Sequence, residues 1–212
     1  MSAELIRPLT QKTLALAARE LAVRDRLLAK IHAKYGDPPL WQRAAGFRTL
    51  VHIILEQQVS LSSAKSMLLR LETAIQPFTP ERFAEVGESY LRGLGVTRQK
   101  SAYLLHLSES LVSGRLKLQS LSRLSDDQVL EKLTGIKGIG LWSANIYLLM
   151  AMRRADIWPA GDLALAVAIK ELKGLATRPS PEELELIAEA WRPHRAVAAR
   201  MLWQYYLGRK SA

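Results

Sequence analysis

Residues Leu133–Trp142 have the sequence LTGIKGIGLW, which places three glycines (Gly135, Gly138 and Gly140) within six positions. The apolar segment SANIYLLMAM follows at once and predicts a helix. Glycines at positions 138 and 140 permit positive φ and remove side chains from the surface. The first N–H groups of a helix have no internal partner and, with the helix dipole, attract anions. The stretch therefore predicts a helix–turn–helix whose backbone, with Lys137 at the tip, binds a phosphate without reading bases.

A glycine-rich turn has two other common interpretations. The turn can be a corner at which two helices pack closely, because a bare Gly-x-Gly pair is weak evidence for a ligand. A dinucleotide-binding fingerprint does not fit, since no strand pattern precedes the turn and Ser143 stands at the third glycine position.

The charge of the chain favours a polyanionic partner. Lys and Arg total 30 against 20 Asp and Glu in 212 residues, giving a formal net charge of +10. Nucleic acid is the first partner that such an excess indicates, and a basic surface that serves solubility is the alternative. An anionic membrane fits less well, because no basic run lies beside a strongly apolar face.

The residue content excludes several classes of site. The chain has no cysteine, which excludes disulfides, thiolate zinc sites and cysteine-bound iron–sulfur clusters. The four histidines are scattered without the spacing of metal ligands. The start of the sequence lacks the apolar core of a signal peptide, and no window approaches the apolar length of a membrane span. We expect a cytoplasmic protein, nucleoid-associated if the source is bacterial.

The hydrophobic periodicity predicts an all-α protein of roughly nine to eleven helices. Apolar residues recur at helical spacing from Thr10 to Tyr35, which we interpret as one helical segment. Thr79 before Pro80 predicts a helix start, and Ser125 with Gln128 has capping-box spacing. No alternating strand pattern persists anywhere in the chain.

A lone acid opens another predicted helix. Asp162 lies in PAGDLALAVAIKEL, where Pro159 and Gly161 form a turn and the helix begins at Leu163. Asp is among the preferred N-cap residues, so the residue pattern by itself favours a structural role for Asp162.

Four stretches together resemble the helix-hairpin-helix DNA glycosylase superfamily over about residues 41–207. They are the glycine turn with Ser143 and Ala144, the Pro-x-Gly-Asp turn that ends in Asp162, and two flanking segments. GFRTLVHIILEQQVS resembles the helix that carries the family's DNA-inserting residues, and WRPHRAVAARMLW resembles its C-terminal segment. The sequence is most similar to the 3-methyladenine DNA glycosylase II branch.

The resemblance implies two packed helical subdomains with a DNA-binding cleft between them and no N-terminal β domain. We expect one subdomain from residues 1–45 with 163–212. Residues 46–162 would form the other, with the hairpin at about 129–150 and the catalytic turn. The implied partner is double-stranded DNA with damaged bases. We expect the protein to be a monomer and not to bind membranes. No cofactor is implied, although a monovalent cation held by hairpin backbone carbonyls is common in the family.

The resemblance also implies roles for individual residues. Asp162 would be the catalytic acid, and Gln58, with Gln57 beside it, would fill the gap left by a flipped nucleotide. An aromatic pocket would hold the base, with Trp142, Tyr147, Trp158 and Trp41 as candidates; core packing is the alternative for each. The expected DNA contacts are the hairpin residues Gly135, Lys137, Gly138 and Gly140, the glutamines Gln57 and Gln58, and four basic residues assigned from their charge: Arg98, Lys100, Arg192 and Arg195.

The expected reaction is hydrolysis of the N-glycosidic bond of alkylated purines such as 3-methyladenine and 7-methylguanine. One carboxylate suffices for them, because a cationic base leaves readily without a second acid. Relatives that also cut the backbone use a lysine two positions after the last hairpin glycine, where this chain has Trp142, so we expect no lyase activity. The alternatives are a non-catalytic DNA-binding protein and a glycosylase for oxidised or mismatched bases. The sequence leaves open whether 1-methyladenine, 3-methylcytosine or hypoxanthine is accepted.

Overall fold

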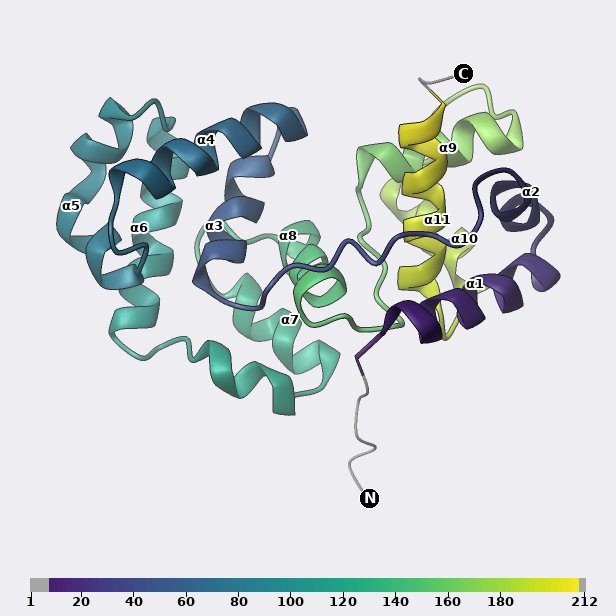
Figure 1. Cartoon of the computed structure of the whole chain (residues 1–212), viewed down its shortest axis with the longest axis horizontal. Helices are drawn as coiled ribbons and strands as arrows, with labels where there is room; N and C mark the ends of the chain where they lie inside the picture. The colour runs from purple at the N-terminus through teal and green to yellow at the C-terminus, as the bar shows by residue number, and fades with distance from the viewer. Residues whose placement is uncertain (1–7, 210–212) are drawn as a thin grey trace. The chain divides into compact units, whose positions relative to one another are not determined.

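The computed structural model describes residues 8–209, whose regular secondary structure is all helical, with no strand (Figure 1). The chain divides into two compact units. We call Arg43–Tyr147 the central unit, and Met1–Gln42 with Leu148–Ala212 the terminal unit. Within residues 8–209, no helix combines the length and apolar character needed to cross a bilayer.

The central unit contains six α-helices and a 3-10 helix within the described residues. Its elements are α3 (Phe47–Glu56), α4 (Leu61–Ala74), α5 (Pro80–Gly93), α6 (Arg98–Val112), the 3-10 helix Leu118–Arg123, α7 (Asp126–Thr134) and α8 (Leu141–Ile146). The predicted helix starts are confirmed, because Thr79 caps α5 ahead of Pro80 and Ser125 forms a capping box with Gln128. Helices α5 and α6 pack together, with Phe83 and Leu104 fully buried.

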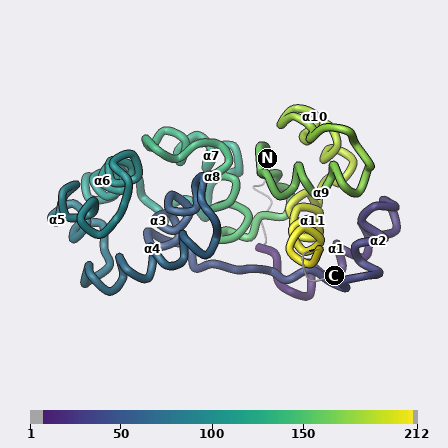
Figure 2. The backbone as a smooth tube through the Cα atoms, turned by 90° about the horizontal axis from the view of Figure 1, so that it is seen from above, coloured from purple at the N-terminus to yellow at the C-terminus, as the bar shows by residue number. Residues whose placement is uncertain are grey.

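The terminal unit is built around its last helix. It contains α1 (Gln11–Arg24), α2 (Arg26–Tyr35), α9 (Leu163–Lys173), α10 (Pro181–Glu189) and α11 (Arg195–Gly208). A π-helical turn, Tyr147–Ala151, continues α8 and carries the chain from one unit into the other. Helix α11 packs against α1, α2 and α9, and every residue from Ala196 to Trp203 is buried. Figure 2 traces the backbone of the same elements from a second direction.

One expected helix is in fact two. The segment from Thr10 to Tyr35 breaks at Asp25, which ends α1 and caps α2. The Asp25 carboxylate accepts the N–H groups of Leu27 at 2.7 Å and Leu28 at 3.1 Å. An N-cap residue has extended backbone, so Asp25 turns the chain without disturbing the apolar periodicity on either side.

The turn that contains Asp162 lies in the terminal unit, whereas the expected division placed it with residues 46–162. The compact unit takes in residues 148–162 because their side chains pack on later helices. Trp158 lies against Trp191, and Asp162 accepts a hydrogen bond from Trp203.

Candidate active site and nucleic-acid interface

The hairpin turn joins α7 to α8, and its backbone requires glycine at one position. Gly138 has φ of +94°. A Cβ atom added there would lie 2.2 Å from Cγ of Tyr103, a contact that no side chain tolerates. Gly138 therefore packs directly on the Tyr103 ring, which fixes the position of the hairpin tip relative to α6.

Gly140 behaves differently from Gly138. Its φ is −84°, so Gly140 does not use the positive φ that glycine permits. A Cβ at Gly140 would meet no atom within 4 Å, and the residue is exposed. The turn needs no glycine here for its own folding, so the bare backbone at Gly140 is free to be approached closely by a ligand.

Helix α8 begins without a side-chain cap. Gly140 is its N-cap, and the first helical hydrogen bond runs from the Ala144 N–H to the Gly140 carbonyl at 3.0 Å. The Lys137 side chain is exposed at the tip of the turn. An exposed helix start beside a lysine is an arrangement that favours an anion.

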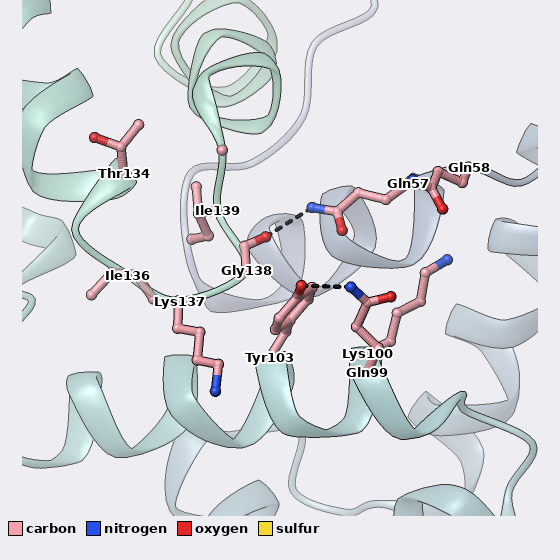
Figure 3. Close-up of a pocket in the computed structure, with 11 residues that line it drawn as sticks. Gln57, Gln58, Gln99, Lys100, Tyr103, Thr134, Ile136, Lys137, Gly138 and Ile139 are labelled. Carbon is pink, nitrogen blue, oxygen red and sulfur yellow. Dashed lines mark hydrogen bonds between the residues drawn. The ribbon is translucent and has the colours of Figure 1, made fainter.

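The end of α3 lies beside the hairpin within the central unit (Figure 3). The Gln57 Nε2 atom donates to the Gly138 carbonyl at 2.8 Å and to Ser143 Oγ at 2.9 Å. Gln58 is exposed and has φ of +57°, which is uncommon for a residue other than glycine. The two glutamines therefore differ: Gln57 faces the hairpin and Gln58 faces solvent.

A pocket of about 410 Å³ lies between the hairpin, the end of α3 and the first turns of α6. In it, Gln99 Nε2 donates to the Tyr103 hydroxyl at 2.7 Å (Figure 3). The Lys100 ammonium donates to the Leu55 carbonyl at 2.7 Å, and burial lowers its pKa. Arg98 is exposed at the start of α6. Arg98 is not among the lining residues of the pocket, whereas Lys100 contacts the end of α3. The lining residues are Gln57, Gln58, Gln99, Lys100, Tyr103, Thr134, Ile136, Lys137, Gly138, Ile139 and Gly140.

Asp162 lies in the terminal unit, as the N-cap of α9. Gly161 has φ of +78° and turns the chain into the helix. The Asp162 side chain is only 8% exposed, and its Oδ1 accepts the Leu165 N–H at 3.1 Å. The same oxygen accepts the indole N–H of Trp203 at 3.2 Å. Two N–H donors on one oxygen fix the orientation of this nearly buried carboxylate.

Two tryptophans of the terminal unit pack together, and one of them contacts Asp162. The Trp41 ring meets the Trp203 ring edge-on at 6.3 Å between centroids, and Trp203 also donates to Asp162. Trp41 is half-buried and has φ of +45°, a strained backbone for an aromatic residue. Trp203 was not among the predicted pocket residues, since its position in a long apolar helix resembles core packing.

The other aromatic candidates have different surroundings. Tyr147, in the central unit, is 1% exposed; its hydroxyl accepts the Gly46 N–H at 3.1 Å, and burial raises its pKa. Trp158 is buried against Trp191, at 5.5 Å between rings, and its indole N–H has no partner within residues 8–209. Trp142 is half-buried in the first turn of α8. The contacts of Tyr147 and Trp158 are those of core residues.

Two predicted phosphate ligands are held by carboxylates. Arg195 donates to Asp156 through Nε at 2.9 Å and to Glu189 through Nη1 at 3.3 Å. Arg192 pairs with the same two acids, at 2.6 Å to Asp156 and 2.8 Å to Glu189. Arg195 is mostly buried and Arg192 is half-exposed. These ion pairs join the segment after α10 to Asp156, so this arrangement gives no support to a phosphate contact by Arg195.

Comparison with known proteins places the chain in a family. Residues 51–193 match the HhH-GPD superfamily of base excision DNA repair proteins. The chain belongs to this superfamily. A solved DNA-3-methyladenine glycosidase from Bacillus halodurans is 30% identical, with a TM-score of 0.77 over 92% of this chain and 91% of that chain. The Schizosaccharomyces pombe 3-methyladenine DNA glycosylase bound to abasic DNA shares the fold, with a TM-score of 0.81 at 24% identity over 89% and 95%.

Two proteins named as 3-methyladenine glycosylases are also similar in sequence to this chain. The DNA-3-methyladenine glycosylase 1 of Schizosaccharomyces pombe is 26% identical over 205 residues, which are 95% of this chain and 89% of that protein. A putative DNA-3-methyladenine glycosylase of Bacillus subtilis is 26% identical over 185 residues, or 84% of this chain. The match spans 64% of the length of that Bacillus protein.

The hairpin of this HhH-GPD protein offers main-chain oxygens, and no side-chain cluster, to a cation. Residues 8–209 contain no cluster of three His, Asp or Glu side chains that would bind a metal ion. The Gly138 carbonyl accepts from Gln57 and the Ile136 carbonyl accepts from the Ile139 N–H at 2.9 Å. Each carbonyl oxygen has a second lone pair, so the hairpin backbone retains the means to hold a monovalent cation.

Proposed function

We propose that this protein is a monofunctional DNA glycosylase that hydrolyses the N-glycosidic bond of alkylated purines, of the 3-methyladenine and 7-methylguanine type. Membership of the base excision repair superfamily and the names of its similar relatives support this function. The observation that carries the proposal is Asp162, a nearly buried carboxylate that receives two N–H donors beside a pair of tryptophans.

In the proposed reaction the bond between the purine nitrogen and C1′ of deoxyribose breaks, and its electron pair leaves with the base. An alkylated purine is cationic, so departure neutralises its charge while positive charge grows on the sugar. The Asp162 carboxylate stabilises that growing charge. Water then bonds to C1′ and gives its proton to the same carboxylate. The bonds from Leu165 and Trp203 keep the carboxylate oriented throughout.

The aromatic pair beside Asp162 suits a flat cationic base. We propose that Trp41 and Trp203 contact the extruded purine, since tryptophan faces attract cations by stacking and cation–π interaction. The second position after Gly140 holds Trp142, whose indole has no amine that forms an imine with the sugar. The products are therefore a free base and an intact abasic strand.

We propose that the central unit binds the DNA backbone. The uncapped start of α8 and Lys137 would hold one phosphate, and exposed Arg98 another, without reading the sequence. Exposed Gln58 would fill the gap when the damaged nucleotide leaves the stack. We propose that the partner is double-stranded DNA containing damaged bases and that the protein acts on it as a monomer. We also propose a cytoplasmic location, at the nucleoid if the source is bacterial.

The proposal is tested by incubating methylated duplex DNA with the protein and identifying released bases by chromatography. We expect free 3-methyladenine and 7-methylguanine, no strand cleavage and no covalent adduct after borohydride reduction. DNA binding without release of any base would indicate the non-catalytic DNA-binding alternative. Release restricted to an 8-oxoguanine or a mismatched duplex would indicate the glycosylase for neutral bases instead.

A further inference from the structure

One side chain joins the candidate gap-filling loop to the phosphate-binding hairpin. The Gln57 amide donates to the Gly138 carbonyl at the hairpin tip and to Ser143 Oγ in the first turn of α8. Ser143 is buried, and its bond with Gln57 is partly shielded from solvent. The residue that makes both bonds is the immediate neighbour of exposed Gln58.

The helix that carries Gln57 is fixed by two further contacts at the same end. The Lys100 ammonium of α6 donates to the Leu55 carbonyl at 2.7 Å. Glu56 is buried, and its carboxylate accepts hydrogen bonds from both terminal nitrogens of Arg43, at 2.8 and 2.6 Å. The end of α3 is therefore held to α6, to the hairpin and to the segment before α3.

The loop beyond Gln57 has little freedom. Only residues 58–60 separate the C-cap of α3 from the start of α4 at Leu61, and Ser60 caps α4 through the Ser63 N–H at 3.2 Å. Gln58 itself has a positive φ. A strained residue persists where its surroundings determine its conformation, and such residues gather at functional sites.

We propose that Gln57 is a positioning residue that fixes the exposed Gln58 relative to the hairpin. Binding of a phosphate at the hairpin then also sets how far Gln58 enters the gap left by the flipped nucleotide. This inference rests on the proposed glycosylase function. In this role Gln57 acts through Gln58 and the hairpin, and it need not touch the reacting atoms. Its two hydrogen bonds convert the loop and the hairpin into one rigid surface, and rigid placement reduces the conformational freedom lost on binding.

The test uses Gln57→Met, which keeps the length of the side chain and removes its donors. Single-turnover excision is measured on 7-methylguanine placed opposite cytosine and, separately, opposite an abasic site. Flipping is easier from the second duplex because no base pair is broken, so gap filling matters less there. We expect Gln57→Met to be about tenfold slower on the paired substrate and within about threefold of wild type on the other.

A matched variant separates positioning from general stability. Gln11→Met removes a similar hydrogen bond, from Gln11 Nε2 to the Pro38 carbonyl at 3.1 Å, in the terminal unit. We expect it to leave both excision rates unchanged. The Gln58→Ala change should slow wild type on the paired substrate but add less than about twofold in the Gln57→Met background, because coupled residues are not additive. Equal slowing of both substrates by Gln57→Met, or no slowing, would overturn the proposal.

Hydrogen exchange on the free protein tests the link independently of catalysis. Gln57→Met should speed amide exchange at residues 138–140 and at residues 58–59 together, and Gln11→Met should speed neither. If wild type releases no 7-methylguanine, the proposed function fails, and the exchange result alone decides whether Gln57 couples the two segments. Unchanged exchange at both segments would contradict the coupling whatever the enzyme does.

Discussion

The indole N–H of Trp203 donates to Oδ1 of Asp162 across 3.2 Å, the same oxygen that caps helix α9. Asp162 is thus held by α11 as well as by its own helix. This arrangement reconciles the structural and the catalytic interpretations of Asp162, because a cap fixes the position of the carboxylate and the indole fixes its orientation. The pairing supports the proposal that Trp203 serves the active site in addition to the core.

Trp203→Phe should keep the aromatic ring and remove the donor. We expect about a tenfold loss in single-turnover excision, the scale of one hydrogen bond to a charged group. Trp191→Phe is a matched control, because the Trp191 indole N–H donates at 2.9 Å to Asp25, a carboxylate that only caps α2. The control should lower thermal stability and leave the excision rate unchanged. Equal rates for wild type and Trp203→Phe would contradict a role for this bond.

Gly138→Ala should lower stability, whereas Gly140→Ala should leave it almost unchanged. At Gly138 the new methyl group meets the Tyr103 ring, and positive φ alone costs about 1–3 kcal/mol. At Gly140 the methyl group meets nothing, so the free energy of unfolding should stay within about 0.5 kcal/mol of wild type. We nevertheless expect Gly140→Ala to weaken DNA binding, because its methyl group covers the start of α8. Chemical denaturation and fluorescence anisotropy measure the two quantities.

Lys137 and Arg195 should differ in the salt dependence of DNA binding. Removing one phosphate contact lowers the slope of log affinity against log salt by about one. Lys137→Ala should show this change, since the lysine is exposed at the hairpin tip. Arg195→Ala should leave the slope unchanged and reduce stability, because it breaks the ion pairs with Asp156 and Glu189. If Arg195→Ala lowers the slope of log affinity against log salt, Arg195 contacts a phosphate after all.

His52 should make the central unit less stable in mild acid. Burial lowers the pKa of His52 below its usual value, despite the opposing attraction of Glu56. The unfolded chain therefore binds a proton at higher pH than the folded chain, and stability falls as pH drops from about 6.5 through the folded pKa. His52→Gln should remove this part of the acid loss, which unfolding by urea between pH 7 and pH 5 measures. An unchanged pH dependence would show that His52 is not its source.

The sequence reveals local features of this fold better than contacts between distant segments. Thr79 and Ser125 were identified as helix caps because the groups that they bind lie within three residues. Asp25 was missed as a helix break because the apolar periodicity continues on both sides of it. Trp203 was missed because nothing near it in the sequence shows that its N–H meets Asp162. Arg195 was assigned to DNA on charge alone, which does not reveal that Asp156 and Glu189 hold it.

The most direct measurement of the central claim compares Asp162→Asn with wild type on methylated duplex DNA. The amide keeps the shape of the side chain and an oxygen for the Leu165 cap, while removing the negative charge. We predict a DNA dissociation constant within about threefold of wild type and a single-turnover excision rate lower by more than about 10²-fold. Release of free base by Asp162→Asn at the wild-type rate would contradict the assignment of Asp162 as the catalytic group.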